Sequence, residues 1–485
     1  MDWRLIVGVV YLILLVLVCL RIIYEIRSTP KALAYMLVVI FIPLLGMFIY
    51  FSFGNNYRKR KLYDRKLVSN VKEAETLKEE ILDYSQDVFD KNGALLEPYK
   101  ELAFMLAKEK ASALTSGNQV KLLVNGEQKF PEVFEALKKA QDHIHIEYYI
   151  YEDDETGRAL ASILMEKAKE GVEVRFIYDD FGSRGVRKKL VPEMKKAGVK
   201  AFPFFRVIFW VLANRINYRN HRKIIVVDGK IGFVGGINVC DKYVNKKGRK
   251  KKLFWRDTHL MIEGPGILQL QRIFLSDWNF CASDNQEHNE RFFPKPEAFS
   301  LKKGKIVQIA SSGPDSDTPT ILFSLLQAIN HAEEEILITT PYFIPSESIL
   351  DALQVSAMGG VKVKLLVPGI SDSKLVNAAA RSYYDDLLAA GVEIYLYQKG
   401  FVHAKTLVTD RKLAVVGTAN LDFRSLALNF EVNAIVYDKE IAGQLADVFF
   451  EDIKYATQIN SEEWLNRKWH KLLGERAARL VSPLL

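Results

Sequence analysis

Two long uncharged apolar runs open the chain. Leu5–Leu20 is mostly leucine, valine and isoleucine, and Ala32–Phe53 is a second uncharged run. At about 1.5 Å per helical residue, each run can cross a hydrocarbon core of about 30 Å. Pro43 and Gly46 lie in the second run, which membrane helices tolerate. Because the connector Tyr24–Lys31 is short, the pattern predicts an antiparallel two-helix transmembrane hairpin.

The alternatives for the first run are a cleaved signal peptide or a buried core helix. A signal peptide has a shorter apolar segment and a small-residue cleavage site, and neither is seen. Positive charges then orient the hairpin. The connector side carries Arg21, Arg27 and Lys31, whereas the other side carries Arg4 and six basic residues within 58–66. This asymmetry predicts that both ends of the hairpin, and the large body that follows, face the cytoplasm.

After the hairpin, the spacing of hydrophobic residues along the chain changes twice. Residues 57–118 are first basic and then polar and helix-prone, and we expect a connecting segment. From residue 119 onward, short β-branched runs alternate with amphipathic stretches, which is typical of an α/β fold. The predicted organisation is therefore a transmembrane hairpin over 1–56, a basic juxtamembrane and helical linker over 57–118, and two halves over 119–300 and 301–485.

The two halves are predicted because one pattern occurs twice in the body. Each copy has a histidine, a lysine two positions later, an aspartate seven positions later and an asparagine seventeen positions later. The members are His221, Lys223, Asp228 and Asn238 in the first copy, and His403, Lys405, Asp410 and Asn420 in the second. Matched spacing over this length is hard to explain by packing alone. Each half reads as strand, helix, strand, the motif hairpin, and a further strand.

The spacing favours phosphoryl chemistry. Side chains alternate along a strand, so the histidine and lysine of each copy share one face. If the halves pack about a pseudo-twofold axis, both copies converge on one site. The lysines and asparagines would bind phosphate oxygens. One imidazole would attack phosphorus and form a phospho-histidine. The other would protonate the leaving alkoxide and later deprotonate the incoming alcohol.

Further acidic residues accompany the motifs. Asp257 and Glu431 occupy equivalent positions after the two copies, and each can orient a histidine through its second ring nitrogen. Asp228 and Asp410 either take part in the chemistry or are turn residues that bind backbone amides. A metal site is the competing interpretation, but it favours imidazoles and carboxylates without intervening lysines. Neither a metal nor another cofactor is expected.

Two inserts distinguish the first half from the second. Residues 205–215 are aromatic and basic, and they are either a core helix or a segment that enters the membrane interface. Residues 242–252 contain seven lysines and arginines, and we expect an exposed loop that contacts acidic lipids.

The net charge becomes informative once its position along the chain is known. The chain has 485 residues, 49% hydrophobic and 26% charged, with three cysteines and a formal net charge of +8. This balance excludes a disordered chain or a disulfide scaffold. The first 66 residues hold ten basic and three acidic residues, so the remaining body is nearly neutral. A nucleic-acid-binding face would need a clear basic excess, so no nucleic-acid partner is expected.

The paired motifs, each with its glycine-containing extension to asparagine, resemble the phospholipase D superfamily over nearly all of residues 120–485. Within it, the chain is similar to the bacterial cardiolipin synthases in five further segments. These are the hairpin segment Pro30–Gly54, the basic segment after it, Asn220–Lys223, Trp255–Asp257 and Leu480–Leu485.

The resemblance implies two homologous phospholipase D-like α/β sandwich halves behind the hairpin. It implies a multi-pass enzyme of the bacterial inner membrane that acts on phosphatidylglycerol among anionic lipids. A phosphatidyl group would pass from one phosphatidylglycerol to another, giving cardiolipin and glycerol, and His221 is the favoured nucleophile. A phospholipase D-type hydrolase or another phosphatidyltransferase is the alternative. Whether phosphatidylethanolamine can also be a donor stays open.

Overall fold

The structure is a computed structural model. It describes residues 3–26, 29–51, 71–110, 112–205, 218–245, 253–282, 290–294, 304–316 and 318–480. The chain divides into two compact units, one formed by residues 1–69 and 206–218 and the other by residues 70–205 and 219–485. Most of the two predicted inserts, residues 206–217 and 246–252, lies outside the described residues.

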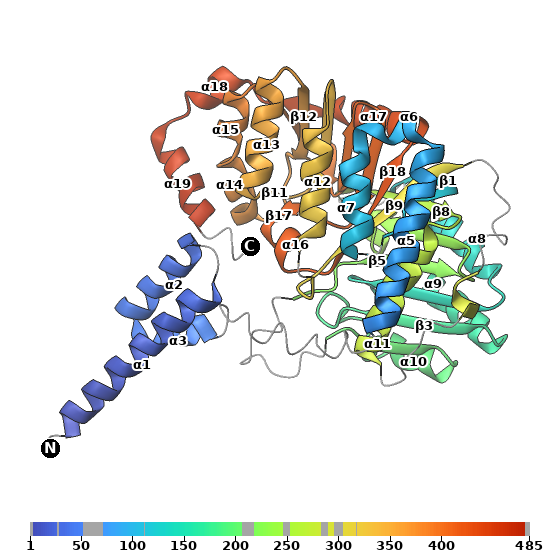
Figure 1. The fold of residues 1–485 in the computed structure, drawn as a ribbon, viewed down its shortest axis with the longest axis horizontal. Coiled ribbons are helices and arrows are strands. Elements are labelled where there is room, and N and C mark those ends of the chain that lie inside the picture. Colours follow the sequence, from blue (N-terminus) through green and yellow to red (C-terminus); the bar gives the residue numbers. More distant parts are fainter. Residues whose placement is uncertain are drawn as a thin grey trace. The chain divides into compact units, whose positions relative to one another are not determined.

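The described part of the N-terminal unit contains three apolar helices. Helix α1 (Trp3–Glu25) has a mean hydropathy of 3.0 over its most apolar window and is the one described helix long and apolar enough to span a membrane. Helices α2 (Thr29–Phe41) and α3 (Pro43–Ile49) fold back on it, as Figure 1 shows. Most apolar side chains of α1 are exposed, for example Leu17 at 56%, which suits a lipid surround.

The predicted second span is not one continuous helix. Ile42 leaves helical geometry at φ −133° and ψ 69°, directly before Pro43, and each of the two pieces is shorter than a spanning helix. The physical reason is that Pro43 has no N–H to continue the helical ladder. The pieces still pack on α1, where the Tyr50 hydroxyl donates to Glu25 at 2.7 Å. The apolar run was predictable from the sequence, but this break in the helix was not.

The second unit is built on a sheet of fifteen strands. Its order is β19-β13-β12-β10-β15-β16-β18-β9-β1-β8-β6-β5-β2-β3-β4. Apart from β19, the sheet consists of two halves of seven strands each. Equivalent strands of the two halves follow one another in opposite orders, and the halves meet where β1 pairs antiparallel with β9. The predicted duplicated α/β fold is therefore confirmed.

The first half contains β1 (Thr115–Val124), β2 (His143–Tyr148), β3 (Glu173–Tyr178), β4 (Lys200–Pro203), β5 (Lys223–Val227), β6 (Ile231–Gly235), β7 (Phe254–Arg256) and β8 (Thr258–Glu263). The second contains β9 (Lys305–Ser312), β10 (Glu335–Thr339), β11 (Phe343–Ile344), β12 (Lys362–Pro368), β13 (Glu393–Tyr397), β14 (Gly400–Val402), β15 (Thr406–Thr409), β16 (Leu413–Gly417), β17 (Leu421–Asp422), β18 (Glu431–Tyr437) and β19 (Ala456–Gln458).

Helices cover the sheet. Those of the first half are α8 (Asn125–Lys138), α9 (Glu155–Lys169), α10 (Leu190–Lys196) and α11 (Ile267–Cys281). Those of the second are α12 (Thr320–Asn330), α13 (Glu347–Met358), α14 (Lys374–Arg381), α15 (Tyr384–Ala389), α16 (Phe423–Ala427), α17 (Lys439–Ile453), α18 (Ser461–Leu465) and α19 (Trp469–Leu480). Before both come α5 (Val71–Lys91), α6 (Gly93–Leu96) and α7 (Lys100–Lys110), whose apolar residues join the core of the second half.

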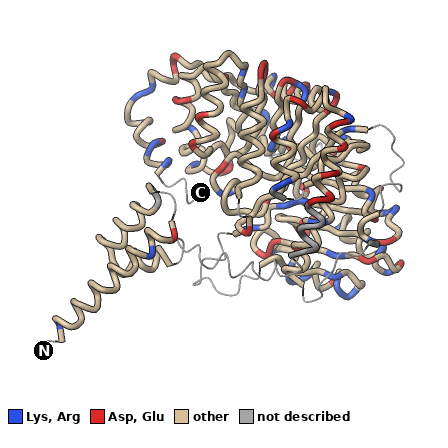
Figure 2. Tube along the Cα trace, in the orientation of Figure 1, with Lys and Arg blue, Asp and Glu red and all other residues tan. Residues whose placement is uncertain are grey.

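The core between the two half-sheets positions the site. Ile224 and Val226 of β5 lie in one apolar cluster with Val408 of β15 and Val416 of β16. The apolar faces of the two motif strands thus contribute to one shared core. Figure 2 shows basic and acidic residues interspersed along this unit, in keeping with its nearly neutral body.

Candidate active site

The two motif histidines are held by backbone pairing between the halves. Just before His403, strand β14 pairs in parallel with β7 of the first half. Just before His221, Asn220 forms a parallel bridge with Phe430 of the second half. The His221 N–H donates to the Phe430 carbonyl at 2.9 Å, and the His403 N–H donates to the Arg256 carbonyl at 2.7 Å. The backbone of each histidine therefore hydrogen-bonds to the opposite half.

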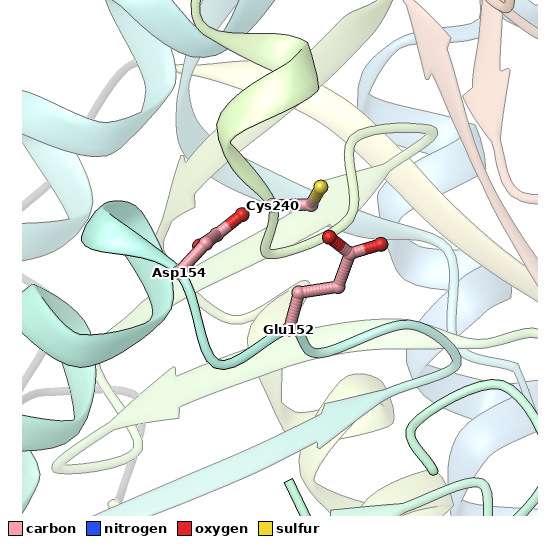
Figure 3. A group of neighbouring side chains, drawn as sticks. All are labelled: Glu152, Asp154 and Cys240. Atoms are coloured by element: carbon pink, nitrogen blue, oxygen red, sulfur yellow. The ribbon is translucent and has the colours of Figure 1, made fainter. Parts of the chain in front are cut away.

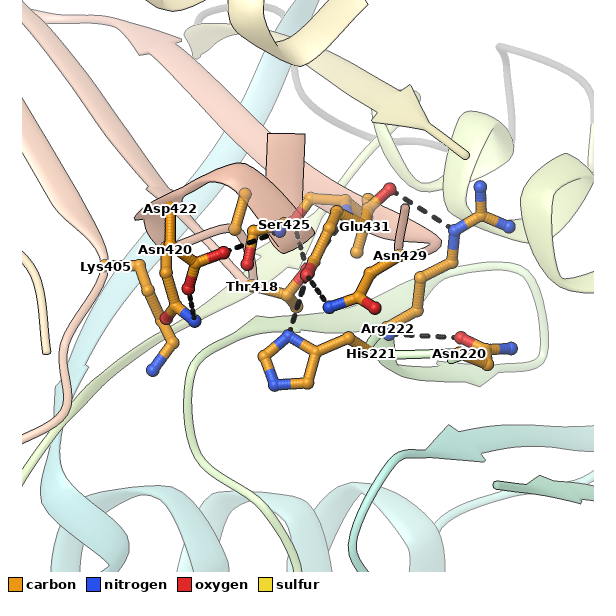
Figure 4. A network of polar contacts seen from close by, with 12 residues as sticks. Asn220, His221, Arg222, Lys405, Thr418, Asn420, Asp422, Ser425, Asn429 and Glu431 are labelled. Carbon is orange, nitrogen blue, oxygen red and sulfur yellow. Dashed lines mark hydrogen bonds and ion pairs between the residues drawn. The ribbon is translucent and has the colours of Figure 1, made fainter. Parts of the chain in front are cut away.

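This pairing gives each histidine a carboxylate from the opposite half. His221 Nδ1 lies 2.9 Å from Glu431 Oε1, and His403 Nδ1 lies 2.7 Å from Asp257 Oδ2. Both carboxylates are fully buried. Figure 4 shows Glu431 directly over the His221 ring. A carboxylate that accepts from Nδ1–H leaves the lone pair of Nε2 available for chemistry.

The two carboxylates are supported differently. Glu431 also accepts hydrogen bonds from the Thr418 hydroxyl and, at 3.3 Å, from the Asn429 amide (Figure 4). Asp257 accepts from the Thr258 N–H at 2.7 Å and packs against Gly236. Gly236 is the counterpart of Thr418 in the repeat. A side chain there would collide with the Asp257 carboxylate, because a Cβ added to Gly236 would fall 2.1 Å from Oδ1.

Burial favours the neutral form of both histidines. Burial lowers the pKa of His221 to about 4, with Lys223 and Lys405 adding to the effect and Glu431 opposing it. Burial also lowers the pKa of His403 well below its ordinary value, helped by the charges of Lys405 and Lys223. Neutral imidazoles can act as a nucleophile or a general base without first losing a proton.

The charges of both motif lysines act on both motif histidines. Lys223 Nζ donates to the His221 carbonyl at 2.7 Å, and Lys405 Nζ donates to the His403 carbonyl. Burial lowers the pKa of Lys223 to about 7 and that of Lys405 to about 8. Glu431 raises both pKa values, so charges from both halves act on each lysine. An anion bound between them would restore their charge.

The two motif asparagines differ in what their amides contact. Asn238 Oδ1 accepts from the Ile150 N–H at 3.2 Å, and its Nδ2 donates to the Tyr243 hydroxyl at 2.8 Å. Asn420 Nδ2 donates to Asp422 at 2.9 Å, as Figure 4 shows. Its buried Oδ1 has no hydrogen-bond partner among the residues that the structure describes.

The motif aspartates point away from this cluster into loops. Asp228 accepts hydrogen bonds from the N–H groups of residues 141–143, at 2.8–3.0 Å. Asp410 accepts from those of residues 333–335, at 2.8–2.9 Å. Each carboxylate thus fixes the loop that enters the strand beside its own motif strand. The geometry favours the turn interpretation over a chemical role.

Asp228→Ala is therefore expected to act on stability. Losing three backbone hydrogen bonds to a partly exposed carboxylate should cost roughly 1–3 kcal/mol of unfolding free energy. Activity per folded molecule should fall much less than in variants of the motif histidines. Thermal unfolding of the detergent-solubilised enzyme would measure the first, and specific activity the second. Asp447→Ala, which removes an exposed carboxylate, is the control; a stable but inactive Asp228→Ala enzyme would contradict the assignment.

Aromatic rings flank the histidines, and sequence analysis missed them. The Tyr149 ring lies edge-on to His221 at 4.9 Å between centroids. Trp255 and Tyr243 lie 5.4 and 5.7 Å from the His403 ring. A signal was present, since Trp255 directly precedes Arg256 and Asp257 in a segment noted for its resemblance. Its contact with the second motif depends on β14 pairing with β7.

Buried arginines were also missed. Arg222 forms an ion pair with Asp277 and donates Nε to the Glu431 carbonyl at 3.3 Å. Arg256 pairs with Asp452 at 2.7 Å and donates to the Asp257 carbonyl. Each arginine thus holds the backbone of a carboxylate that contacts a histidine. The sequence places Arg222 beside His221 but gives no indication of these partners.

A separate group of possible metal ligands lies in the first half. Glu152, Asp154 and Cys240 have ligand atoms within 4.8 Å of one another (Figure 3). The Asp154 carboxylate is already engaged, because it accepts from the N–H groups of Gly157 at 2.9 Å and of Asp241 at 2.6 Å. Burial raises the pKa of the Cys240 thiol, which disfavours the thiolate a metal needs. We assign no metal to this group.

Comparison with known proteins identifies the family. The family described as "Cardiolipin synthase, PLD-like domain" matches residues 133–278 and 325–453, one segment in each half. The family "Phospholipase_D-nuclease N-terminal" matches residues 12–55. Among solved structures, phosphatidylserine synthase of Haemophilus influenzae has a TM-score of 0.57 at 15% identity, covering 80% of this chain and 99% of its own, and so shares the fold.

The fold and the duplicated motif define a member of the phospholipase D superfamily. Curated relatives narrow the class. The major cardiolipin synthase ClsA of Bacillus subtilis is 40% identical over 98% of both chains. A cardiolipin synthase of Listeria innocua is 38% identical over 95% of both. The chain belongs to the cardiolipin synthase family, whose members are phosphatidyltransferases.

Proposed function

We propose that this protein transfers a phosphatidyl group from one phosphatidylglycerol to the free glycerol hydroxyl of another, giving cardiolipin and glycerol. The observation that carries the proposal is the pair of neutral, buried histidines, each held by a carboxylate of the opposite half. Two such imidazoles can serve opposite sides of one phosphorus atom, as in-line displacement requires. The names of the curated relatives support cardiolipin as the product.

The reaction runs in two displacements. Nε2 of one histidine attacks phosphorus and forms a P–N bond, while the P–O bond to the donor's glycerol headgroup breaks. The other histidine takes up a proton from solution as the anionic phosphodiester enters and raises the pKa of its imidazole, and it gives this proton from Nε2 to the departing glycerol alkoxide. That same histidine then removes the hydroxyl proton of the second phosphatidylglycerol. The new P–O bond forms, the P–N bond breaks, and the free enzyme returns.

The remaining motif residues stabilise charge. Lys223 and Lys405 offset the negative charge that builds on the nonbridging oxygens of phosphorus. The amides of Asn238 and Asn420 are proposed to bind the same oxygens. Glu431 and Asp257 orient their histidines and stabilise the imidazolium that forms when a proton is taken up. Asp228 and Asp410 support the two loops from outside the reacting centre.

The apolar helices suit a membrane enzyme. Association with the membrane rests on α1 and on the match of residues 12–55. We propose further that residues 1–56 form a membrane-embedded hairpin with both ends in the cytoplasm of a bacterial cell. Residues 57–118 would connect it to the halves 119–300 and 301–485. Because the donor and acceptor are both lipids, holding the enzyme at the membrane favours transfer over hydrolysis.

The direct test is lipid mass spectrometry. Full-length enzyme in vesicles of phosphatidylglycerol is expected to form cardiolipin together with glycerol. Phosphatidic acid without cardiolipin would instead indicate a phospholipase D-type hydrolase and would overturn the proposal. Vesicles that also contain phosphatidylethanolamine would show, by release of ethanolamine, whether that lipid is a donor.

The pKa values predict a bell-shaped pH profile for kcat/KM. Burial raises the pKa of Asp257 to about 6, so below this pH the carboxyl is protonated and His403 loses its negatively charged partner. Above about 7 to 8, Lys223 and Lys405 lose the protons that phosphate binding requires. Activity should therefore rise through about pH 6 and fall through about pH 7–8. Asp257→Asn should remove the acidic limb; an unchanged acidic limb would contradict its origin.

A further inference from the structure

An arginine beside the site is buried without a hydrogen-bond partner. Arg219 is 4% exposed, and both terminal nitrogens of its guanidinium lack a partner among the described residues. The carbonyl of the same residue accepts from the Phe430 N–H at 2.9 Å, so its backbone is fixed at the contact between the halves. A buried, unpartnered guanidinium is costly, and such groups are normally paired or bound to an anion.

The groups around Arg219 are mainly cationic. Its guanidinium lies 4.4 Å from the centre of the Phe181 ring, and Arg184 lies 4.1 Å from the same ring. Burial lowers the pKa of Arg219, and the charges of Arg424 and Arg184 lower it further. We call Arg184, Arg219 and Arg424 the arginine cluster.

The Asp179 carboxylate faces Arg219 but is already hydrogen-bonded elsewhere. Asp179 raises the pKa of Arg219 through its charge. Its oxygens accept hydrogen bonds from the N–H groups of Phe181 at 3.0 Å, Gly182 at 2.8 Å and Asn220 at 3.2 Å. Asp179 is therefore engaged by the backbone and not by the terminal nitrogens of the Arg219 guanidinium. The ring that covers Arg219, Phe181, is 38% exposed.

The cluster adjoins the reacting centre through Tyr149. The ring of Tyr149 lies against His221, and the charges of Arg219 and Arg424 both act on its phenol. Arg219 comes two residues before His221, and Arg424 comes four residues after Asn420. The cluster thus combines the two halves, as the histidine sites do.

The proposed reaction needs a second anion site close to the reacting phosphorus. The product carries two phosphates on one glycerol, so the second lipid's own phosphate must be held within one glycerol's length of the reacting phosphorus. We propose that the arginine cluster binds the phosphodiester of the second, accepting phospholipid, with Phe181 moving aside to admit it. This inference rests on the proposed function and names the recognition of its acceptor. Guanidinium groups suit it, since they bind phosphate oxygens in pairs.

Two reactions of the same enzyme separate this role from the chemistry. Cardiolipin formation needs an acceptor that carries a phosphate. Exchange of labelled glycerol into phosphatidylglycerol uses the same donor and both histidines, but its acceptor has no phosphate. Arg219→Met in the full chain should lower cardiolipin formation about tenfold to a hundredfold while leaving glycerol exchange near the wild-type rate. Arg219→Lys, which keeps a positive charge, should restore part of the loss.

Stability gives a second readout. Because the terminal nitrogens of the Arg219 guanidinium have no hydrogen-bond partner among the described residues, replacing this residue with methionine should leave the thermal unfolding midpoint unchanged or raise it. Arg291→Met, which removes an exposed charge of the same half, is the matched control and should change neither reaction. Equal loss of both reactions, no loss of either, or a lowered midpoint would overturn the proposal. A wild-type enzyme that exchanges glycerol but forms no cardiolipin would instead refute the proposed function.

Discussion

Replacing either His221 or His403 with alanine is expected to reduce cardiolipin formation by about a thousandfold or more. Without one imidazole there is no phosphoryl acceptor, and without the other there is no proton donor for the leaving glycerol. Groups that act as a unit in this way lose most of the rate when one is removed. The two variants should therefore be almost equally inactive, and the double variant hardly worse than either. Lipid mass spectrometry with phosphatidylglycerol vesicles measures all three.

The two roles can be told apart with an altered donor. A phosphatidyl ester of nitrophenol has a leaving group that needs no protonation. With this donor, the variant that lacks the proton-donating histidine should release nitrophenol and accumulate a phospho-histidine. The variant that lacks the nucleophilic histidine should do neither. His331→Ala, a change at a partly exposed histidine outside the repeat, is the control. Full activity in either motif variant, or recovery in both, would refute the two-histidine site.

The repeat made the location of the site predictable. Identical spacing from His221 to Asn238 and from His403 to Asn420 indicated two similar strand hairpins, and the apolar strands between them required a shared core. The structure has such a core, where Ile224 and Val226 join Val408. A pattern that is repeated at this length carries information on both local structure and symmetry.

The choice of partners was not predictable. Asp257 and Glu431 were recognised as equivalent, but the sequence does not say which histidine each contacts. That choice depends on β14 pairing with β7 and on the bridge from Asn220 to Phe430, which join segments far apart in the chain. The local periodicity of hydrophobic residues does not predict contacts between such distant segments.

Other features depend on atomic detail. Pro43 was judged tolerable within one long helix, yet the backbone leaves helical geometry at Ile42. Arg219 was not singled out in the sequence, because whether a guanidinium has a partner is a property of its surroundings. Asp228 could be either reactive or structural until its three backbone donors were located.

The contacts between the halves lead to the second large effect. Glu431→Gln and Asp257→Asn are each expected to lower activity by about a hundredfold to ten-thousandfold, as when the orienting carboxylate of a catalytic histidine is neutralised. The amide preserves the size of the side chain but removes the charge that stabilises an imidazolium. Each substitution disables the histidine of the opposite half. Cardiolipin formation at saturating phosphatidylglycerol should therefore fall through kcat rather than through KM.

Gly236 offers a test of the same contact without altering a charged group. Its repeat counterpart is Thr418, so a symmetric enzyme would accept threonine in both copies. Here a Cβ at residue 236 would lie 2.1 Å from Asp257 Oδ1 and must displace the carboxylate from His403. Gly236→Ala should thus approach the loss of Asp257→Asn, while Gly443→Ala, at a helical glycine with open space around it, should be silent. An active Gly236→Ala enzyme would show that the Asp257–His403 contact is not required, because the collision cannot be relieved without moving that carboxylate.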